Sequence, residues 1–256
     1  MKITRLVTAL LLAGPLAWAF AAQADTTTFR GVSVDYGDAS ASWVDGELVL
    51  TYGGDGQLTL GGTVRADILA VGGGGAGGTG KSSTTNARYG NGGNGGEVVE
   101  TPQVILSSAL TIKIGGGGTG STTSNAKGGD GNDTTVESAD GSFVAITAKG
   151  GAGGAGNNTS TQAKAGSPTQ GVTSEIDGKT YGKGGAKFTN ATAQAGDPNT
   201  GNGGQGGRAG VPSVSARADR TRGGSRGGRI VRGRLRGDVA VGLEDAADVA
   251  VGIQAD

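Results

Sequence analysis

Short apolar runs alternate with glycine tracts along most of the chain. A run rich in Ile, Leu, Val and Ala passes directly, or after one Lys, into a tract of Gly at residues 66–75, 110–118 and 143–154. Runs of five or six such residues are typical of strands. The repeat therefore predicts a mainly β fold of short strands that alternate with glycine-rich segments, with low helix content and partial disorder.

Residues 25–71 predict an N-terminal β segment. Alternation and β-branched content indicate strands at Phe29–Val34, Glu47–Tyr52, Gln57–Leu60 and Val64–Val71. The sequence Gly53-Gly54-Asp55-Gly56 between two of these runs is typical of a hairpin turn.

A glycine-rich domain is predicted to follow at residues 72–210. Its further predicted strands are Glu97–Glu100, Val104–Leu106, Leu110–Ile114, Thr134–Val136, Phe143–Ala148, Val172–Ile176 and Ala186–Thr189. Ordering one residue costs about 1–2 kcal/mol, so an isolated glycine tract stays flexible. A strand before each tract favours clamped tracts whose backbones pack side by side, because Gly has no Cβ. The strict third-residue glycine period of collagen is absent.

Composition excludes several classes of protein. The 256 residues include 56 Gly, no Cys and no His, and the formal net charge is zero. No disulfide framework and no Ser–His or Cys–His nucleophile can form. Near-neutral charge argues against a general polyanion binder, and we expect no nucleic-acid partner. The sequence therefore predicts a non-enzymatic protein without a cofactor.

The first 24 residues are predicted to be a signal peptide. Lys2 and Arg5 precede an apolar stretch that ends in Ala22-Gln23-Ala24, the small-x-small pattern of a cleavage site. We expect cleavage before Asp25 and a secreted or cell-surface product with no stable membrane insertion. Retention of the stretch as a membrane anchor is the alternative.

Two motifs suggest ligand chemistry. Gly128-Gly129-Asp130-Gly131-Asn132-Asp133 fits one copy of a calcium-binding nonapeptide repeat, which makes Asp130 and Asp133 the calcium candidates. Stacked copies are absent, so a polar turn before the next strand is favoured. Residues 75–82 match a phosphate-binding loop, but a polar run and another glycine tract follow in place of a helix. We therefore predict no catalytic, cofactor or metal site.

The tail at residues 211–256 differs in kind. Nine of the 13 Arg lie between Arg208 and Arg236, and a segment rich in Ala, Val and Asp follows. One explanation is a basic, disordered tail with a biological role, and the other is translation out of frame beyond Val211. No final apolar strand is evident there.

The order of the tracts resembles a known family. The runs at residues 68–75, 92–99, 110–118 and 128–132 are similar to the glycine-rich domains of exported bacterial surface proteins and phage tail adhesins. The resemblance covers about residues 47–210. It implies packed polyglycine helices, a closing apolar strand, and a function in surface display or receptor binding.

The sequence thus predicts an exported structural or adhesive protein of the cell surface or extracellular matrix. Its partner is expected to be a surface receptor or matrix component, with self-association as a further possibility. The expected contacts are the polar loops Lys81–Tyr89, Ser121–Lys127 and Asn157–Pro168. The alternatives are a phage-like receptor-binding adhesin and, less favoured, a calcium-dependent or ice-binding module.

Overall fold

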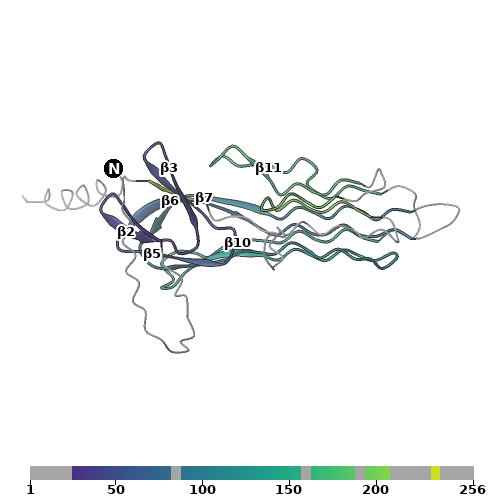
Figure 1. Cartoon of the computed structure of the whole chain (residues 1–256), viewed down its shortest axis with the longest axis horizontal. Helices are drawn as coiled ribbons and strands as arrows, with labels where there is room; N and C mark the ends of the chain where they lie inside the picture. The colour runs from purple at the N-terminus through teal and green to yellow at the C-terminus, as the bar shows by residue number, and fades with distance from the viewer. Residues whose placement is uncertain (1–24, 82–87, 157–162, 188–193, 208–231, 237–256) are drawn as a thin grey trace, which may run out of the picture.

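The computed structural model describes residues 25–81, 88–156, 163–187, 194–207 and 232–236. These residues contain strands and no helix. Strands gather at one end of the molecule, and long glycine-rich segments extend from them side by side (Figure 1). The predicted mainly β fold with alternating strands and glycine segments is therefore confirmed.

The first sheet has six strands in the order β1-β2-β5-β8-β9-β10. Every pair in it is antiparallel. Its strands are β1 (Thr26–Phe29), β2 (Val32–Asp35), β5 (Gly56–Leu60), β8 (Leu110–Lys113), β9 (Thr134–Ser138) and β10 (Ile146–Ala148).

The second sheet has five strands in the order β3-β4-β13-β6-β7, again all antiparallel. Its strands are β3 (Ser40–Val44), β4 (Glu47–Thr51), β13 (Arg232–Arg236), β6 (Val64–Val71) and β7 (Val98–Leu106). Strand β13 lies between β4 and β6, which do not pair with each other.

The two sheets share one hydrophobic core. Side chains from both sheets form a single buried cluster, which includes Phe29, Leu58 and Ile112 of the first sheet and Leu50 and Ile68 of the second. The structure therefore contains a β-sandwich, whose core forms mainly from the short strands.

Strand β6 is buried on both faces. Ala66, Ile68 and Ala70 belong to the core between the sheets. The alternate residues Leu69 and Val71 pack with Tyr181 in a second cluster. Tyr181 lies on the small hairpin of β11 (Val172–Thr173) and β12 (Thr180–Tyr181), which covers the outer face of β6.

Three of the predicted strands differ in the structure because of local backbone geometry. The run 29–34 is split at Arg30 and Gly31, whose φ angles of 47° and 84° form a tight turn between β1 and β2. The runs 97–100 and 104–106 are parts of one strand, β7. A register shift in this strand occurs opposite Asp67, whose carboxylate accepts the Gln103 N–H at 2.8 Å.

Other predicted elements were wrong in position. Gly53–Gly56 is not a hairpin turn, because β4 and β5 belong to different sheets. Strand β10 begins only at Ile146 and β11 ends at Thr173. Ala186 and Lys187 form no strand, and the rest of that predicted strand lies outside the described residues.

The tail contributes a strand that sequence analysis did not find. Residues 232–236 pair with β4 on one side and β6 on the other. The expectation that the closing strand is missing is therefore wrong. The predicted N-terminal β segment, residues 25–71, also shares its sheets with the residues that follow it, since β5 pairs with β8 and β6 pairs with β7.

Within the described residues, no helix is long and apolar enough to cross a membrane.

Replacement of Ile112 by Ala should destabilise the fold by about 2–5 kcal/mol, because it leaves a cavity at a fully buried position of β8. Chemical denaturation measures the change. Val144→Ala is the matched control, since Val144 is 90% exposed and its loss should change stability by less than about 0.5 kcal/mol. Equal effects of the two substitutions would contradict the assigned core.

Candidate functional site: a polyglycine array and its distal tip

Residues 72–80 form the centre of a bundle of glycine segments, which we call the glycine array. The N–H groups of residues 72, 75 and 78 donate to the carbonyls of residues 97, 94 and 91, and those of 73, 76 and 79 donate to 132, 129 and 126. The carbonyls of 73 and 76 accept from 151 and 154, and those of 75 and 78 from 204 and 207. This three-residue repeat is that of a polyproline-II-type helix.

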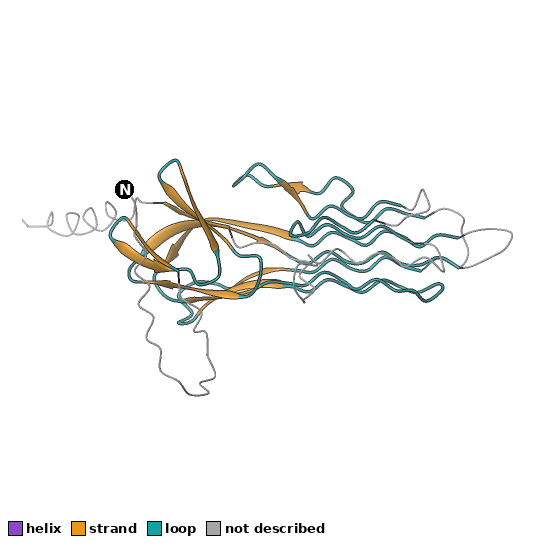
Figure 2. Ribbon diagram, in the orientation of Figure 1, coloured by secondary structure: helices purple, strands orange, loops and turns teal. Residues whose placement is uncertain are grey.

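The neighbouring segment 90–97 repeats the pattern. The N–H groups of residues 90, 93 and 96 donate to the carbonyls of 207, 204 and 201, and those of 91, 94 and 97 donate to 155, 152 and 149. Figure 2 shows these segments as extended loops that run side by side away from the strands. The array is thus a set of extended glycine helices joined laterally by backbone hydrogen bonds.

Glycine is required in the array because the segments lie too close for a Cβ. A Cβ added at Gly72, Gly75 or Gly93 would lie under 3.0 Å from the backbone atoms of a neighbouring segment. The obstacle is main chain, which cannot move aside as the end of a flexible side chain can. The positions therefore require Gly for their close approach.

Gly75→Ala should destabilise the protein by about 1–3 kcal/mol or more, because the Cβ of the new Ala would overlap the Ala152 backbone. Thermal unfolding measures the loss. Gly53→Ala is the matched control, since a Cβ at Gly53 meets nothing within 4 Å. A Gly75→Ala protein as stable as the Gly53→Ala protein would contradict the close packing.

Polar side chains extend the lateral bonding at the outer segments. The side-chain oxygens of Asn91 and Asn94 accept the N–H groups of Lys164 and Ser167. Asp130 and Asp133 accept those of Gly153 and Gly150, and Asn202 and Gln205 accept those of Lys183 and Gln194. On each segment the two acceptor residues are three positions apart, so their side chains recur once per turn of the extended helix.

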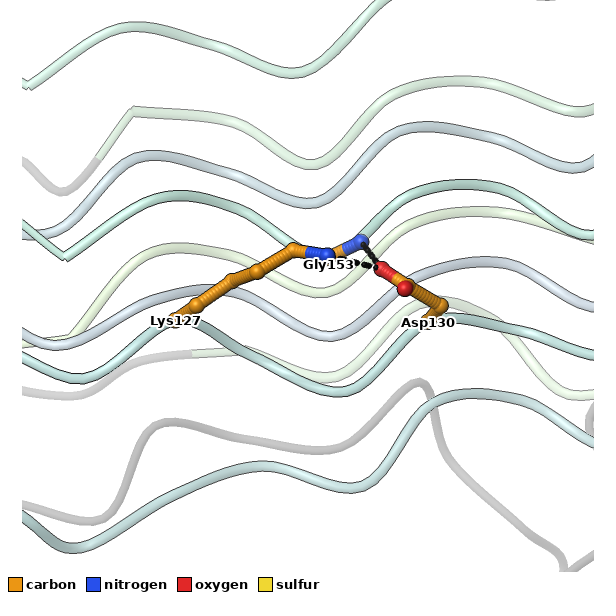
Figure 3. Close-up of polar contacts among 3 residues, drawn as sticks. All are labelled: Lys127, Asp130 and Gly153. Carbon is orange, nitrogen blue, oxygen red and sulfur yellow. Dashed lines mark hydrogen bonds and ion pairs between the residues drawn. The ribbon is translucent and has the colours of Figure 1, made fainter.

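Asp130 and Asp133, the calcium candidates, lie in this arrangement. One Asp130 oxygen accepts the Gly153 N–H and an Nζ–H of Lys127, each at 2.6 Å (Figure 3). Asp133 accepts the Gly150 N–H at 2.8 Å. Both lie on an extended segment and not on the polar turn that the sequence favoured. The described part of the chain holds no group of three or more His, Cys, Asp or Glu residues suited to a metal ion.

The hydrogen bond from Lys127, followed by that from the Gly153 amide, lowers the pKa of Asp130 below its ordinary value of 3.8. The folded chain therefore holds this carboxylate ionised to a lower pH than the unfolded chain does. Its contribution to stability is complete above the unfolded pKa and is lost as the pH falls through the lowered folded pKa.

A carboxyl NMR titration should show Asp130 titrating below 3.8 in the native protein. Lys127→Met should move the midpoint back toward 3.8, because the largest cause of the shift is removed. Lys149→Met is the control and should leave the midpoint unchanged. An Asp130 midpoint at or above 3.8 in the unsubstituted protein would contradict the contact.

Described residues of several array segments lie at the end of the array far from the sheets, which we call the distal tip (Figure 1). Its described residues are Lys81, Arg88, Tyr89, 121–126, Gly156, Ala163, Lys187, Gln194 and Gly207. Gly80 accepts from Asn125 and donates to Gly207, and the Asn91 N–H donates to Ala155 beside Gly156. The Gln205 side chain donates to the Lys187 carbonyl, and its N–H to the Gln194 carbonyl. Segments distant in sequence thus end together.

Thr79 holds the loop 121–126 against the central segment. Its side chain is fully buried, its hydroxyl donates to the Thr123 carbonyl, and its oxygen accepts the Ala126 N–H at 2.8 Å. Sequence analysis did not identify Thr79, because it lay within the phosphate-loop match. In the structure, the amides of residues 75, 76, 78, 79 and 80 in that match already donate to neighbouring segments.

The structure places the described residues of the three predicted contact loops in different parts of the array. Residues 121–126 of the predicted loop Ser121–Lys127 and the described flanks of Lys81–Tyr89 lie at the distal tip. Residues 163–168 of the third predicted loop return along the array, where Gly92 and Gly95 donate to Lys164 and Ser167. Residues 82–87 and 157–162 lie outside the described part of the chain.

The sequence analysis also did not identify the side-chain hydrogen-bond acceptors that are spaced three residues apart, although the sequence contains a signal for them. Asn91 and Asn94, and Asp130 and Asp133, are each spaced by three within glycine tracts. That spacing matches the turn of an extended glycine helix.

A family model described as a glycine-rich domain matches residues 51–241. The match includes most of both sheets, the glycine array and β13. The chain therefore belongs to the glycine-rich domain family. No curated protein matches the chain.

Proposed function

We propose that this glycine-rich domain protein is an exported, non-enzymatic structural or adhesive protein, which presents its distal tip to a polar polymer of the cell surface or matrix. The observation that carries the proposal is the convergence of described residues from separate segments, the loop 121–126 among them, at one end of the array. A surface made of several chain segments on a common support is a frequent design of binding sites.

The array would hold the tip in place and away from the sandwich. From Gly72 to Gly80 the central segment extends by about 25 Å at the rise of a polyproline-II-type helix. Hydrogen bonds to several neighbours fix it along this length. A preordered tip loses less conformational entropy when it binds, which favours affinity.

The chemistry of the tip favours a polar, negatively charged partner. Residues 121–125 are Ser, Thr and Asn, and four of the five are exposed. The basic residues Lys81, Arg88 and Lys187 lie at the same end, and the described residues of the tip include no Asp or Glu. Hydroxyl and amide groups with added positive charge suit an acidic polysaccharide of a cell envelope or matrix.

Two parts of the proposal rest on the sequence. The signal-like residues 1–24 support export. The absence of His and Cys from the chain removes the commonest nucleophile systems and supports a non-enzymatic function.

A tip variant tests the proposal. Lys81→Ser and Lys187→Ser, combined with Ala at residues 121–125, should reduce attachment of the purified protein to cell envelopes of the producing organism at least about tenfold. Added salt should weaken attachment of the unsubstituted protein, because exposed charges are screened. Sedimentation of labelled protein with envelopes measures both effects.

The matched control carries Lys113→Ser and Lys149→Ser, two exposed lysines near the sheets. It should attach as the unsubstituted protein does, and circular dichroism should show that both variants remain folded. Undiminished attachment of a folded tip variant, or no attachment of the unsubstituted protein, would contradict the proposal.

A further inference from the structure

The slot between β4 and β6 is filled by a strand from the far end of the sequence. Gly233 lies opposite Leu50 on one side and Ile68 on the other, and Leu235 lies opposite Leu48 and Ala66. Because both neighbours are antiparallel to β13, they are parallel to each other. They do not pair with each other, and β13 lies between them in the sheet.

The walls of the slot are core residues. Leu48, Leu50, Ala66 and Ile68 are each at most 1% exposed. Without β13, two strand edges with unpaired N–H and C=O groups would lie beside this core. Such edges are templates for pairing with another chain.

The chain that delivers β13 is longer than its path requires. Gly207 forms a bridge with Thr79, and Arg232 pairs with Leu69, ten residues earlier along the central segment. That separation is about 31 Å at a rise of 3.1 Å per residue. The 24 residues at 208–231 are enough to span at most about 80 Å. They suffice for the chain's own slot and for that of a neighbour.

We propose that the slot between β4 and β6 is an interaction site for residues 232–236 of a second copy, so that neighbouring copies exchange their final strands. In dilute solution each copy fills its own slot, because its own strand belongs to the same chain and so meets the slot at a higher effective concentration than the strand of another copy. Copies crowded side by side on a surface reach comparable concentrations and exchange. The slot lies at the opposite end from the distal tip, so the exchange leaves the tip exposed. The crowding on a surface rests on the proposed function, but the ability of two copies to exchange the strand does not.

A shortened tether tests the exchange in the full protein. Deletion of residues 211–228 leaves six residues, which reach at most about 20–25 Å and cannot span the path within one copy. The shortened chain should therefore form dimers or larger assemblies, with at least a twofold rise in mass by light scattering. Replacement of the same 18 residues by an equally long Gly/Ser segment is the control and should leave the protein monomeric when dilute.

Disulfide trapping identifies the contact. Thr51 and Arg232 are direct partners in the register, and the chain has no Cys of its own. Mixed shortened chains carrying either Thr51→Cys or Arg232→Cys should form a 51–232 disulfide between copies. The full-length Thr51→Cys, Arg232→Cys double variant should form it within one copy when dilute.

If the shortened chain does not fold, the exchange is tested with the two full-length single variants, Thr51→Cys and Arg232→Cys. They are refolded together at several millimolar and analysed for a disulfide between copies. A 51–232 link between copies supports the exchange. A folded shortened monomer, assemblies without that link, or no link between copies at high concentration would overturn it.

Discussion

The glycine array depends on the close approach of backbones that carry no side chains. Where Gly72, Gly75 and Gly93 pass their neighbours, the space for a Cβ is occupied by main-chain atoms. This approach brings N–H and C=O groups of adjacent helices into hydrogen-bond contact on several sides at once. A net gain of about 0.5–1.5 kcal/mol for each hydrogen bond is close to the cost of ordering one residue, so the array is marginal by itself.

The sandwich supplies the anchorage that the array lacks. Strands β6, β8 and β10 continue directly into array segments, and β7 and β9 begin where segments return. Thr134 joins the two regions, since its buried hydroxyl donates to the Val71 carbonyl and its oxygen accepts the Gly115 N–H. Each segment therefore starts or ends at a residue already fixed by a sheet, which lowers the entropy that remains to be lost.

The sequence allowed prediction of the features that follow from local pattern. The buried run Val64–Val71 was predicted with its observed bounds, because it has β-branched residues at 64, 68 and 71 and leads directly into the first glycine tract. Strand β13 was not predicted, since Arg-Gly-Arg-Leu-Arg has no apolar alternation and owes its place to the paired edges of β4 and β6. The distal tip was predicted only in part. Its assembly depends on which tract lies beside which, and glycine tracts are too alike to encode that order locally.

Amide hydrogen exchange of the native full-length protein, followed residue by residue with NMR, distinguishes packed glycine segments from flexible ones. Slow exchange is expected at residues 73, 75, 76 and 78, whose N–H groups donate to neighbouring segments. Gly53 and Gly54, which lie in the connection between the sheets, should exchange quickly. Exchange of residues 73–78 at the rate of an unstructured glycine peptide would mean that the tracts are flexible linkers, and it would contradict the array.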